Sequence, residues 1–502
     1  MAGKYVGAVD QGTTGTRFMV FDVDGAVVAS QYQEHRQIYP RPGYVEHDAS
    51  EIWSNTRLVM HGALEQAGIK LEALVAIGVT NQRETTLVWD RESGEPLTNA
   101  IVWQDTRTRD RCEELRRAGL SGRIRRRTGL EVATYFSAPK LEWILDNVKG
   151  ARRSAERGRL LFGTIDSWLI WWMTGGPNGG THVTDCSNAS RTLLMDLRTL
   201  QWDRGLLELF QVPIEMLPAI RPSSDRRAYG RTLGQVPVTA DLGDQQAALF
   251  GQTCFRRGEG KNTYGTGSFL LVNTGRTPVR SRHGLLTTVA YGLRPGHCTY
   301  ALEGSIAVTG AAVQWLRDNL QIVSSAQETE AVAASVADAG GAYFVPAFSG
   351  LFAPHWDMDA RGVIVGLTRY VTRAHLVRAT LEAICYQTAE VVTAMEQDSG
   401  SRLRALRVDG GAAGNDLLMQ MQADILGVPV VKPAVTETTA LGAAYAAGLA
   451  TGFWPSLAAL RSKARAGRTY RPAMSVAARR RGMASWKKAV ARSRGWLDPG
   501  RS

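Results

Sequence analysis

Apolar and polar positions along the chain alternate in a way that predicts an α/β protein. Apolar runs of strand length lie at 75–80 (VAIGVT), 85–90 (TTLVWD) and 100–104 (AIVWQ). Stretches of helical length follow at 137–147 and 164–173. Because strands that alternate with helices pack as layers, this order favours sheets covered by helices.

The start of the chain predicts a β-hairpin with a polar turn. The segment VGAVDQGTTGTRFMVFD, residues 6–22, is an apolar run that ends at Asp10, a turn, and a second apolar run at 18–21. A Walker-type phosphate loop would continue with Lys-Ser or Lys-Thr and a helix, whereas this chain resumes as a strand. We therefore expect the turn to join two antiparallel strands.

The composition of this turn suits an anion. Gly12 and Gly15 accommodate positive φ, so successive backbone N–H groups can converge on a phosphate. Hydroxyl groups and one guanidinium add further donors, from Thr13, Thr14, Thr16 and Arg17. Asp10 cannot bind phosphate directly, but it can hold the Mg²⁺ that accompanies one. The alternative is an ordinary Asx-type turn with solvated hydroxyls.

A second passage of the same kind divides the chain into two halves. NTYGTGSFLLVNTG, residues 262–275, again combines glycines, hydroxyls and an apolar strand, and two such turns could hold a phosphate chain from both sides. We place the boundary near 251–260, between an N-terminal domain at 1–252 and a C-terminal domain at 253–502. The alternative for the two hairpins is that they are unrelated.

A third glycine turn precedes a helix expected to begin near Asn415, and this turn suits a nucleotide.

The segment ADLGDQQAALFG places Asp244 after a glycine turn and at the start of an apolar helical run. An aspartate there can cap the helix. It can also act as a general base that takes the proton of an alcohol as a phosphoryl group arrives. The two roles are compatible, and both stay open.

Four other residues suit a small neutral polyol. Arg83 and Glu84 stand side by side in TNQRETT and offer a donor and an acceptor for hydroxyl groups. Adjacent strand residues point to opposite faces, so both meet one ligand only if the backbone is irregular there. Trp103 and Tyr135 can add an apolar wall and a further hydroxyl. The alternatives are a surface ion pair and two core aromatics.

Charge and cysteine content narrow the functional classes. The net charge is +12, but residues 461–502 hold 13 Lys or Arg and one acid, so the remainder of the chain is neutral. We interpret this basic tail as the solvated face of a closing helix and expect no nucleic-acid partner. Five scattered cysteines without a C-x-x-C pair, the lack of a signal-peptide pattern and the lack of a membrane-length apolar run favour the cytoplasm.

Eight segments carry a resemblance to a known family. DQGTTGTR, TNQRETT, AIVWQ, GDQQAALFGQ, NTYGTGSF, YALEGS, VDGGAAGN and TALGAAYAAGLA occur in the order found in the FGGY carbohydrate kinases, within the actin-like ATPase superfamily. The chain resembles the members of this family that phosphorylate glycerol, from about Tyr5 to Trp496. The resemblance implies two α/β domains with actin-like, ribonuclease H-like cores and an active-site cleft between them. It also implies a transferase of glycerol catabolism that makes sn-glycerol 3-phosphate and ADP from glycerol and MgATP.

The same resemblance implies roles for individual residues. The glycerol pocket would be formed by Arg83, Glu84, Trp103, Tyr135, Asp244 and Gln245, with Asp244 as the base. The ATP site would be formed by Thr13, Thr14, Gly15, Arg17, Thr266, Gly310, Gln314, Gly411 and Asn415, with Asp10 on Mg²⁺. The resemblance further implies a homo-oligomer, a dimer or a tetramer, and the sequence does not decide between them.

Two segments depart from the family pattern: one carries Phe352 and His355 at positions where the family usually has glycine and tyrosine, and the other is the run after Tyr229. Relatives that respond to fructose 1,6-bisphosphate have a longer glycine-rich loop than the run between Tyr229 and Val236, so we predict that this response is absent. Two other functions stay open: a kinase for another small polyol or ketose, and an actin-like assembly or ATP-switch protein. The latter would keep the phosphate turns but has no need of Arg83, Glu84 and Tyr135.

Overall fold

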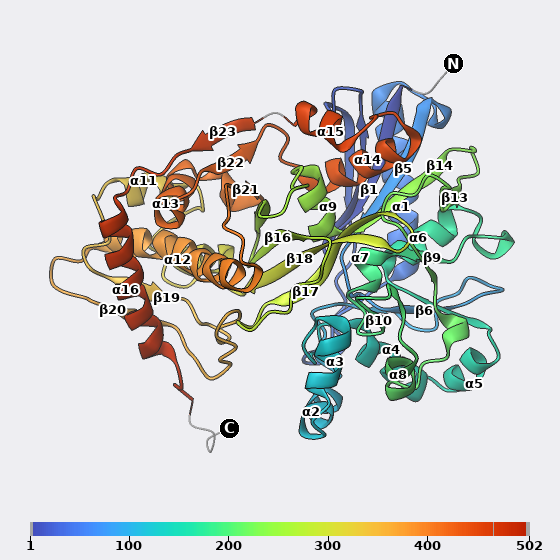
Figure 1. Cartoon of the computed structure of the whole chain (residues 1–502), viewed down its shortest axis with the longest axis horizontal. Coiled ribbons are helices and arrows are strands. Elements are labelled where there is room, and N and C mark those ends of the chain that lie inside the picture. Colours follow the sequence, from blue (N-terminus) through green and yellow to red (C-terminus); the bar gives the residue numbers. More distant parts are fainter. Residues whose placement is uncertain (1–3, 465, 498–502) are drawn as a thin grey trace.

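The chain folds into two lobes, each built on a mixed β-sheet (Figure 1). The computed structural model describes residues 4–464 and 466–497. In Figure 1 the first half, blue to green, lies on the right, and α12, α13 and α16 of the second half lie on the left, whereas α14 and α15 lie beside the first half. None of the helices in the described ranges is long and apolar enough to span a membrane.

The sheet of the first half has the strand order β13-β14-β5-β1-β2-β3. Its strands are β1 (Tyr5–Gln11), β2 (Gly15–Phe21), β3 (Val27–Glu34), β5 (Leu74–Asn81), β13 (Gly230–Arg231) and β14 (Pro237–Gly243). β1 pairs antiparallel with β2 and parallel with β5. The predicted hairpin at the start of the chain is thereby confirmed.

The sheet of the second half repeats this arrangement, with the order β17-β18-β16-β15-β21-β22-β23. Its strands are β15 (Gly260–Tyr264), β16 (Ser268–Gly275), β17 (Leu286–Arg294), β18 (His297–Ile306), β21 (Leu406–Asp409), β22 (Val430–Pro433) and β23 (Ala466–Tyr470). β15 pairs antiparallel with β16 and parallel with β21, as β1 does with β2 and β5. The second predicted hairpin is confirmed, and both halves share one core topology.

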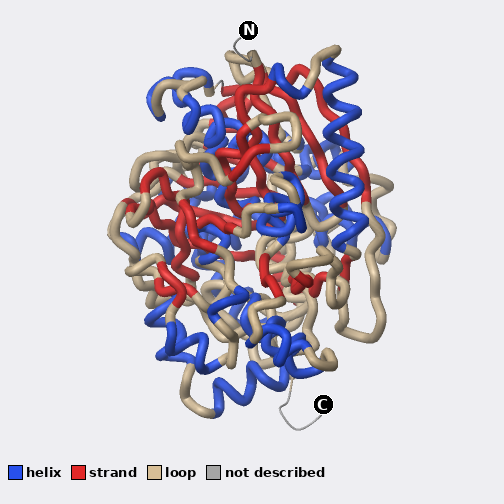
Figure 2. Tube along the Cα trace, turned by 90° about the vertical axis from the view of Figure 1, so that its right-hand side faces the viewer, coloured by secondary structure: helices blue, strands red, loops and turns tan. Residues whose placement is uncertain are grey.

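Helices surround the strands, as the side view in Figure 2 shows. In the first half they are α1 (Ala49–Ala67), α2 (Arg109–Arg117), α3 (Ser121–Thr128), α4 (Ser137–Asn147), α5 (Ala151–Glu156), α6 (Ile165–Met173), α7 (Cys186–Ala189), α8 (Arg204–Leu209) and α9 (Asp244–Gly251). In the second half they are α10 (Gly310–Asp318), α11 (Glu328–Ala334), α12 (Arg373–Ser399), α13 (Asp416–Leu426), α14 (Thr438–Thr451), α15 (Leu457–Lys463) and α16 (Val476–Ser493). The helices predicted at 137–147 and 164–173 correspond to α4 and α6.

Short elements complete the fold. The remaining strands are β4 (Glu46–His47), β6 (Leu87–Asp90), β7 (Ala100–Ile101), β8 (Leu160–Gly163), β9 (Val183–Asp185), β10 (Met195–Asp196), β11 (Gln201–Trp202), β12 (Ala219–Arg221), β19 (Tyr343–Val345) and β20 (Val363–Val365). The 3₁₀ turns are η1 (Leu71–Ala73), η2 (Gly176–Asn178), η3 (Ile214–Met216) and η4 (Gly411–Gly414). The predicted strands at 75–80, 85–90 and 100–104 correspond to β5, β6 and β7, of which β7 is shorter than predicted.

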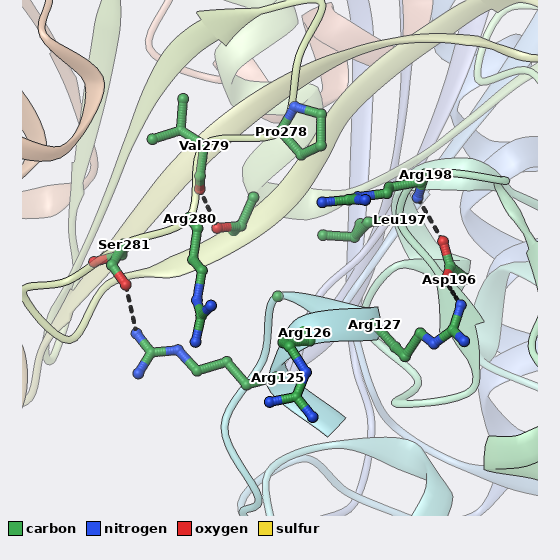
Figure 3. A pocket seen from close by; sticks show the side chains of 12 residues that line it. Arg125, Arg126, Arg127, Asp196, Leu197, Arg198, Pro278, Val279, Arg280 and Ser281 are labelled. Carbon is green, nitrogen blue, oxygen red and sulfur yellow. Dashed lines mark hydrogen bonds and ion pairs between the residues drawn. The ribbon is translucent and has the colours of Figure 1, made fainter. Parts of the chain in front are cut away.

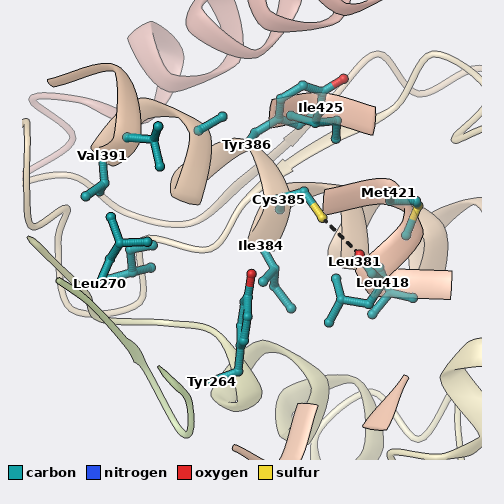
Figure 4. Packing of buried hydrophobic residues seen from close by; sticks show 14 of the residues in the cluster. Tyr264, Leu270, Leu381, Ile384, Cys385, Tyr386, Val391, Leu418, Met421 and Ile425 are labelled. Atoms are coloured by element: carbon teal, nitrogen blue, oxygen red, sulfur yellow. Dashed lines mark hydrogen bonds between the residues drawn. The ribbon is translucent and has the colours of Figure 1, made fainter. Parts of the chain in front are cut away.

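The largest hydrophobic core lies in the second half, where α12 and α13 pack against the sheet (Figure 4). Leu381, Ile384 and Leu418 from these helices join Tyr264 and Leu270 from the hairpin, and all five are at most 1% exposed. Burying an aliphatic side chain of this size stabilises the fold by about 1.5 to 3 kcal/mol. This packing fixes the second hairpin against α12 and α13.

Helices α9 and α14 cross between the two sheets with their backbones in contact. A Cβ atom on Gly442 of α14 would overlap the carbonyl oxygen of Ala247 in α9, and one on Gly251 would overlap the carbonyl oxygen of Thr438. α14 belongs to the second half by sequence, yet a Cβ on Gly78 of β5 would overlap its Ala443 carbonyl. Glycine is required here because the helices and the strand approach too closely for side chains.

The basic tail packs mainly on the second half, and its Lys463 pairs with Asp24 of the first half. In α16, Trp486 is fully buried and stacks on Tyr386 with ring centroids 5.4 Å apart, while most other positions of the helix are exposed. Arg461 pairs with Glu259 at 2.6 Å. The interpretation of the tail as a solvated helix face is confirmed for α16, and positions 465 and 498–502 of the predicted tail lie outside the described residues.

Candidate active site

The turn of the first hairpin is built around Gly15. The Gly12 amide donates to the Gly15 carbonyl at 2.9 Å. A Cβ on Gly15 would lie 2.6 Å from both the Gln33 carbonyl oxygen and the Tyr32 hydroxyl, so only glycine fits. Thr14 is exposed, with its hydroxyl 3.3 Å from that of Tyr32. The turn therefore presents backbone groups and the small hydroxyls of Thr13 and Thr14.

Two side chains connect this turn to other parts of the molecule. The Trp103 indole donates to the Thr13 hydroxyl at 3.0 Å. The Arg17 guanidinium forms an ion pair with Glu437, which lies just before α14 in the second half. The predicted phosphate ligands Thr13 and Arg17 are thus joined to a predicted polyol residue and to the second half.

Asp10 lies in β1, next to this turn. Burial and the negative charge of Asp244 raise its pKa to about 7, and Arg17 opposes this rise only in part. Two mutually repelling carboxylates form an arrangement that a divalent cation relieves. Mg²⁺ is usually bound by one or two carboxylates together with phosphate and water. No larger cluster of metal ligands lies within the described ranges.

The turn of the second hairpin meets the start of α10. The Thr266 carbonyl accepts from the Thr309 amide at 2.9 Å. Gly310, the first residue of α10, donates to the Gly265 carbonyl at 3.0 Å, and a Cβ on Gly310 would lie only 2.6 Å from that oxygen. Gln314 follows one turn later and is exposed. The structure therefore brings Thr266, Gly310 and Gln314 to one place.

The third glycine turn lies against the second hairpin. Gly410 has a φ of 85°, and a Cβ on it would overlap the carbonyl oxygen of Tyr264 at the end of β15. A Cβ on Gly411 would meet no atom within 4 Å, so open space borders this turn. Asn415 caps α13 by accepting from the Leu418 amide at 2.8 Å, which confirms the predicted helix start.

Arg83 and Glu84 lie together between β5 and β6. Glu84 has a φ of 61°, so the irregular backbone that both side chains need to meet one ligand is present. Arg83 Nε is 3.8 Å from a Glu84 carboxylate oxygen and 3.2 Å from Asp244 Oδ1. An Arg83 nitrogen also donates to the Tyr135 hydroxyl at 3.4 Å. The surface ion pair considered for this dipeptide is excluded, because Arg83 and Glu84 are 2% and 1% exposed.

Aromatic side chains border this group. The rings of Trp103 and Tyr135 are 5.4 Å apart between centroids, and Phe269 of β16 lies 6.5 Å from Trp103. The Arg83 guanidinium lies 5.9 Å from the Phe269 ring centroid. Trp103 and Tyr135 are only partly buried, and Tyr135 also packs against the buried side chain of Phe136, so Tyr135 lies at the border of the hydrophobic core.

Asp244 is the first residue of α9, and Gln245 follows it. The N-cap is Gly243, which offers no side chain, and the Asp244 carboxylate accepts from the Gln245 amide at 2.7 Å. The Asp244 side chain is 30% exposed. The Gln245 side chain accepts from the ammonium group of Lys261, which also donates to the Thr263 hydroxyl at 2.7 Å. Burial lowers the Lys261 pKa to about 8, although the carboxylates of Asp409 and Asp244 oppose this shift.

Arg191 and Glu303 complete a ring of four buried charges. Glu303 accepts from two nitrogens of Arg83 at 2.6 and 3.1 Å. Arg191 donates to Glu84 at 2.6 Å and to Glu303 at 3.0 Å. Burial would raise the pKa of Glu303, but Arg191 and Arg83 outweigh it and lower the pKa to about 2. We call Arg83, Glu84, Arg191 and Glu303 the buried ring.

Sequence reasoning did not identify Arg191, Glu303 or Lys261 as site residues. A signal for Glu303 was present, because YALEGS places a lone carboxylate in an otherwise apolar strand. Arg191 in NASRTLL carries no comparable signal.

The predicted site residues fall into two groups in the structure. The polyol residues are joined by the contacts above, and Thr13 and Asp10 adjoin them. In the described ranges, no hydrogen bond or ion pair connects Thr266, Gly310 or Asn415 with Asp244. The direct contacts within the described ranges therefore form two separate groups.

Known proteins match this chain along nearly all of its length. The model of the FGGY family of carbohydrate kinases, N-terminal domain, matches residues 5–251, and that of the C-terminal domain matches residues 260–451. Glycerol kinase of Chloroflexus aurantiacus is 59% identical over 99% of this chain and all of its own. Glycerol kinase 2 of Streptomyces avermitilis is 59% identical over 99% of this chain and 98% of its own.

Solved structures agree with these matches. Plasmodium falciparum glycerol kinase with ADP superposes with a TM-score of 0.92 at 37% identity, over 97% of this chain and 98% of that chain. A xylulose kinase from Lactobacillus acidophilus, 23% identical over 98% of this chain and 97% of its own, shares the fold with a TM-score of 0.85. The two duplicated sheets, the two glycine turns and these matches lead to one conclusion: the chain belongs to the FGGY family of carbohydrate kinases.

Proposed function

We propose that this chain transfers the γ-phosphoryl group of MgATP to glycerol and releases sn-glycerol 3-phosphate and ADP. The observation that carries the proposal is the meeting of Arg83, Glu84 and Asp244 beside partly buried aromatics. A small polyol needs such a mixture of donors and acceptors. The choice of glycerol is supported by relatives named glycerol kinase that match the whole chain at 59% identity.

Asp244 is the general base in this proposal. Its carboxylate is partly exposed at the start of α9, next to Arg83, where a substrate hydroxyl can reach it. It takes the proton of the terminal hydroxyl while that oxygen bonds to the γ-phosphorus. The bond between the γ-phosphorus and the bridging oxygen breaks, and ADP leaves with the electron pair. Arg83, Glu84, Trp103, Tyr135 and Gln245 hold the other hydroxyls and the carbon chain.

The nucleotide is bound by the two glycine turns. Thr13, Thr14, Gly15, Arg17 and Thr266 contact phosphates, and Gly310, Gln314, Gly411 and Asn415 surround the rest of the nucleotide. Arg17 exchanges its Glu437 partner for a phosphate, which a guanidinium can bind with two parallel hydrogen bonds. Asp10 holds Mg²⁺, which neutralises charge on the phosphate oxygens when bound.

Three residues act on substrate through others and are positioning residues. Glu303 and Arg191 orient Arg83 and Glu84 through the buried ring. Lys261 fixes the Gln245 side chain. Because guanidinium groups bind carboxylates in a planar fork, the ring fixes direction as well as distance.

Membership of this family also supports the domain boundary and the assembly that we propose. The boundary lies between residues 252 and 253, and the two family matches, which end at 251 and begin at 260, support it. We propose a cytoplasmic homo-oligomer, a dimer or a tetramer.

The test is ADP release measured across glycerol, dihydroxyacetone, erythritol, xylulose and gluconate, each at matched concentration with MgATP. We expect kcat/KM to be highest for glycerol. A glycerol rate no greater than ATP hydrolysis without acceptor would refute the proposal. A higher kcat/KM for xylulose or gluconate would assign the chain to another activity of the same family.

A further inference from the structure

A second pocket lies where the two halves of the chain meet (Figure 3). Its volume is about 450 Å³, and it shares no lining residue with the candidate active site. One wall is formed by α3 and the turn after β10 in the first half, and the other by the loop 276–285 and the start of β17 in the second. Five arginines line it: Arg125, Arg126, Arg127, Arg198 and Arg280.

The positive charge of this pocket is not balanced. Arg125 pairs with Glu131 at 2.8 Å, and Arg127 pairs with Asp196 at 2.9 Å. Arg126, Arg198 and Arg280 are exposed, and no carboxylate within residues 4–464 and 466–497 forms an ion pair with them. Figure 3 shows all five arginines arranged around one space. A ligand with several negative charges would complete the pocket.

The walls of the pocket are held by backbone contacts. The Thr287 amide donates to the Gly129 carbonyl at 3.0 Å, and the Leu197 amide donates to the Arg127 carbonyl at 2.9 Å. Gly129 has a φ of 74°, and a Cβ on it would lie 2.5 Å from the Thr287 carbonyl oxygen and 2.6 Å from a Leu197 methyl. Glycine thus lets α3 approach β17, and these contacts fix the backbone of the two walls.

The lining defines the chemistry of the ligand. Guanidinium groups bind phosphate through paired hydrogen bonds, and three unbalanced charges call for more than one phosphate. The apolar lining consists of Leu197, Pro278 and Val279, and it contains no aromatic ring on which a base could stack. We propose that this pocket binds a small anion with two or more linked phosphate groups, of which inorganic pyrophosphate is the simplest.

The position of the pocket implies that a bound anion affects both halves of the chain. Arg126 belongs to the first half and Arg280 to the second, so a bound anion holds the two halves together. Thr287 lines the pocket, and the next residue of β17, Thr288, accepts a hydrogen bond from Gln246 at 3.2 Å. Gln246 in turn accepts from Arg83 at 3.3 Å. The pocket is therefore joined to the buried ring through β17 and two hydrogen bonds of Gln246 in α9.

The test compares the full chain with two double variants in calorimetric titrations with pyrophosphate, without Mg²⁺. Arg126→Ala/Arg280→Ala removes two unbalanced charges from the pocket. The matched control, Arg123→Ala/Arg282→Ala, removes two charges from the same helix and the same loop but outside the lining. Any pyrophosphate bound at the glycine turns is common to all three proteins and cancels in the comparison.

We expect the full chain and the control to bind one more pyrophosphate than the pocket variant, or to bind it at least about tenfold more tightly. Pyrophosphate should also raise the melting temperature of the first two proteins but not of the pocket variant. Titration with ADP tests whether the linked phosphates belong to a nucleotide. A second bound ADP that is lost only in the pocket variant would show that the pocket accepts the diphosphate of a nucleotide.

Three results would overturn the proposal. Equal pyrophosphate binding by all three proteins would show that the pocket does not bind it, and an equal loss in both double variants would reduce the effect to net charge. Binding of a short single-stranded oligonucleotide that is lost only in the pocket variant, without any pyrophosphate binding, would assign the pocket to nucleic acid.

Discussion

The buried ring of the candidate active site and the exposed arginines of the second pocket differ in how their charge is balanced. In the ring, Arg83 and Arg191 are 2% and 0% exposed, and each contacts Glu84 and Glu303. In the pocket, Arg126 is exposed, and within the described ranges no carboxylate pairs with it. The first cluster is closed to water and balanced, whereas the second is solvated and carries surplus charge.

This difference shows what solvent permits. Removing an ion from water costs several kcal/mol, so a buried cation has to be compensated by carboxylates of the protein itself. An exposed guanidinium remains hydrated, and its charge stays available to a ligand. A buried cluster therefore serves to position neighbouring groups, while an exposed one can serve to recruit an anion.

The largest effect is expected at Asp244, where the ring meets solvent. Asp244→Asn keeps the size of the side chain but removes its ability to accept a proton. General-base loss usually lowers the rate by about 10² to 10⁴. We expect kcat for glycerol phosphorylation to fall by this factor, while ADP binding measured by calorimetry is unchanged. Near-normal turnover would show that Asp244 only balances the charge of Arg83.

The second prediction contrasts a buried and a partly exposed ion pair directly. Glu303→Gln leaves the buried side chains of Arg83 and Arg191 with one carboxylate fewer, and we expect a loss of about 3 to 5 kcal/mol in the free energy of unfolding. Glu259→Gln breaks the Glu259–Arg461 pair, in which Arg461 is 33% exposed, and should cost less than about 1 kcal/mol.

Urea unfolding of the two variants measures this contrast, and steady-state kinetics separates positioning from stability. If Glu303 is a positioning residue, Glu303→Gln should also raise the KM for glycerol far more than the KM for ATP. If the two substitutions cost the same free energy and Glu303→Gln leaves both KM values unchanged, the ring has neither role.

The third prediction concerns Asp10, which is partly exposed and so lies between the two extremes. Its pKa rises from 3.8 to about 7 in the folded protein, so the folded state binds the proton more tightly than the unfolded state. The free energy of unfolding should therefore fall as the pH rises from about 4 to about 7 and then level off. Without Mg²⁺, Asp10→Asn should be more stable at pH 8 by about 1 to 2 kcal/mol, after allowance for solvent screening.

Thermal or urea unfolding at pH 5 and pH 8 tests this sign. The two proteins should differ less at pH 5 than at pH 8. A variant that is less stable than the parent at pH 8 would show that ionised Asp10 is already compensated inside the protein.

The smallest effect is expected in the second pocket. Without a polyanion, Arg126→Ala/Arg280→Ala should change the free energy of unfolding by no more than about 0.5 kcal/mol, because both side chains are solvated. Urea unfolding in a buffer free of phosphate checks this value. A loss of several kcal/mol would mean that these arginines are structural and would remove the contrast with the ring.

Much of the fold could be predicted from the sequence because it is encoded locally. The hairpin around Gly12 and Gly15, the helix at 137–147 and the start of α13 at Asn415 depend on residues close together in the chain. The sequence also indicates that Arg83 and Glu84 meet one ligand only if the backbone is irregular there, and Glu84 has a positive φ.

The buried ring could not be predicted in this way. Glu303 contacts Arg83 from 220 positions away, and Arg191 contacts Glu84 from 107 positions away. No periodicity links such positions, since their proximity results from the packing of the two halves. The sequence also does not decide whether Asp244 caps α9. The helix could begin at Asp244 or one residue later, and the structure shows that Gly243 is the N-cap and Asp244 the first helical residue.

The hydrogen bond from Trp103 to Thr13 has a consequence for the order of events in a catalytic cycle. One partner borders the proposed site for the acceptor, and the other belongs to the proposed site for the donor. If glycerol shifts Trp103, the affinity of Thr13 for a phosphate changes, and thermodynamic linkage requires that ATP change the affinity for glycerol by the same factor. A single indole hydrogen would then make the two substrates cooperative and disfavour transfer of the phosphoryl group to water when the acceptor is missing.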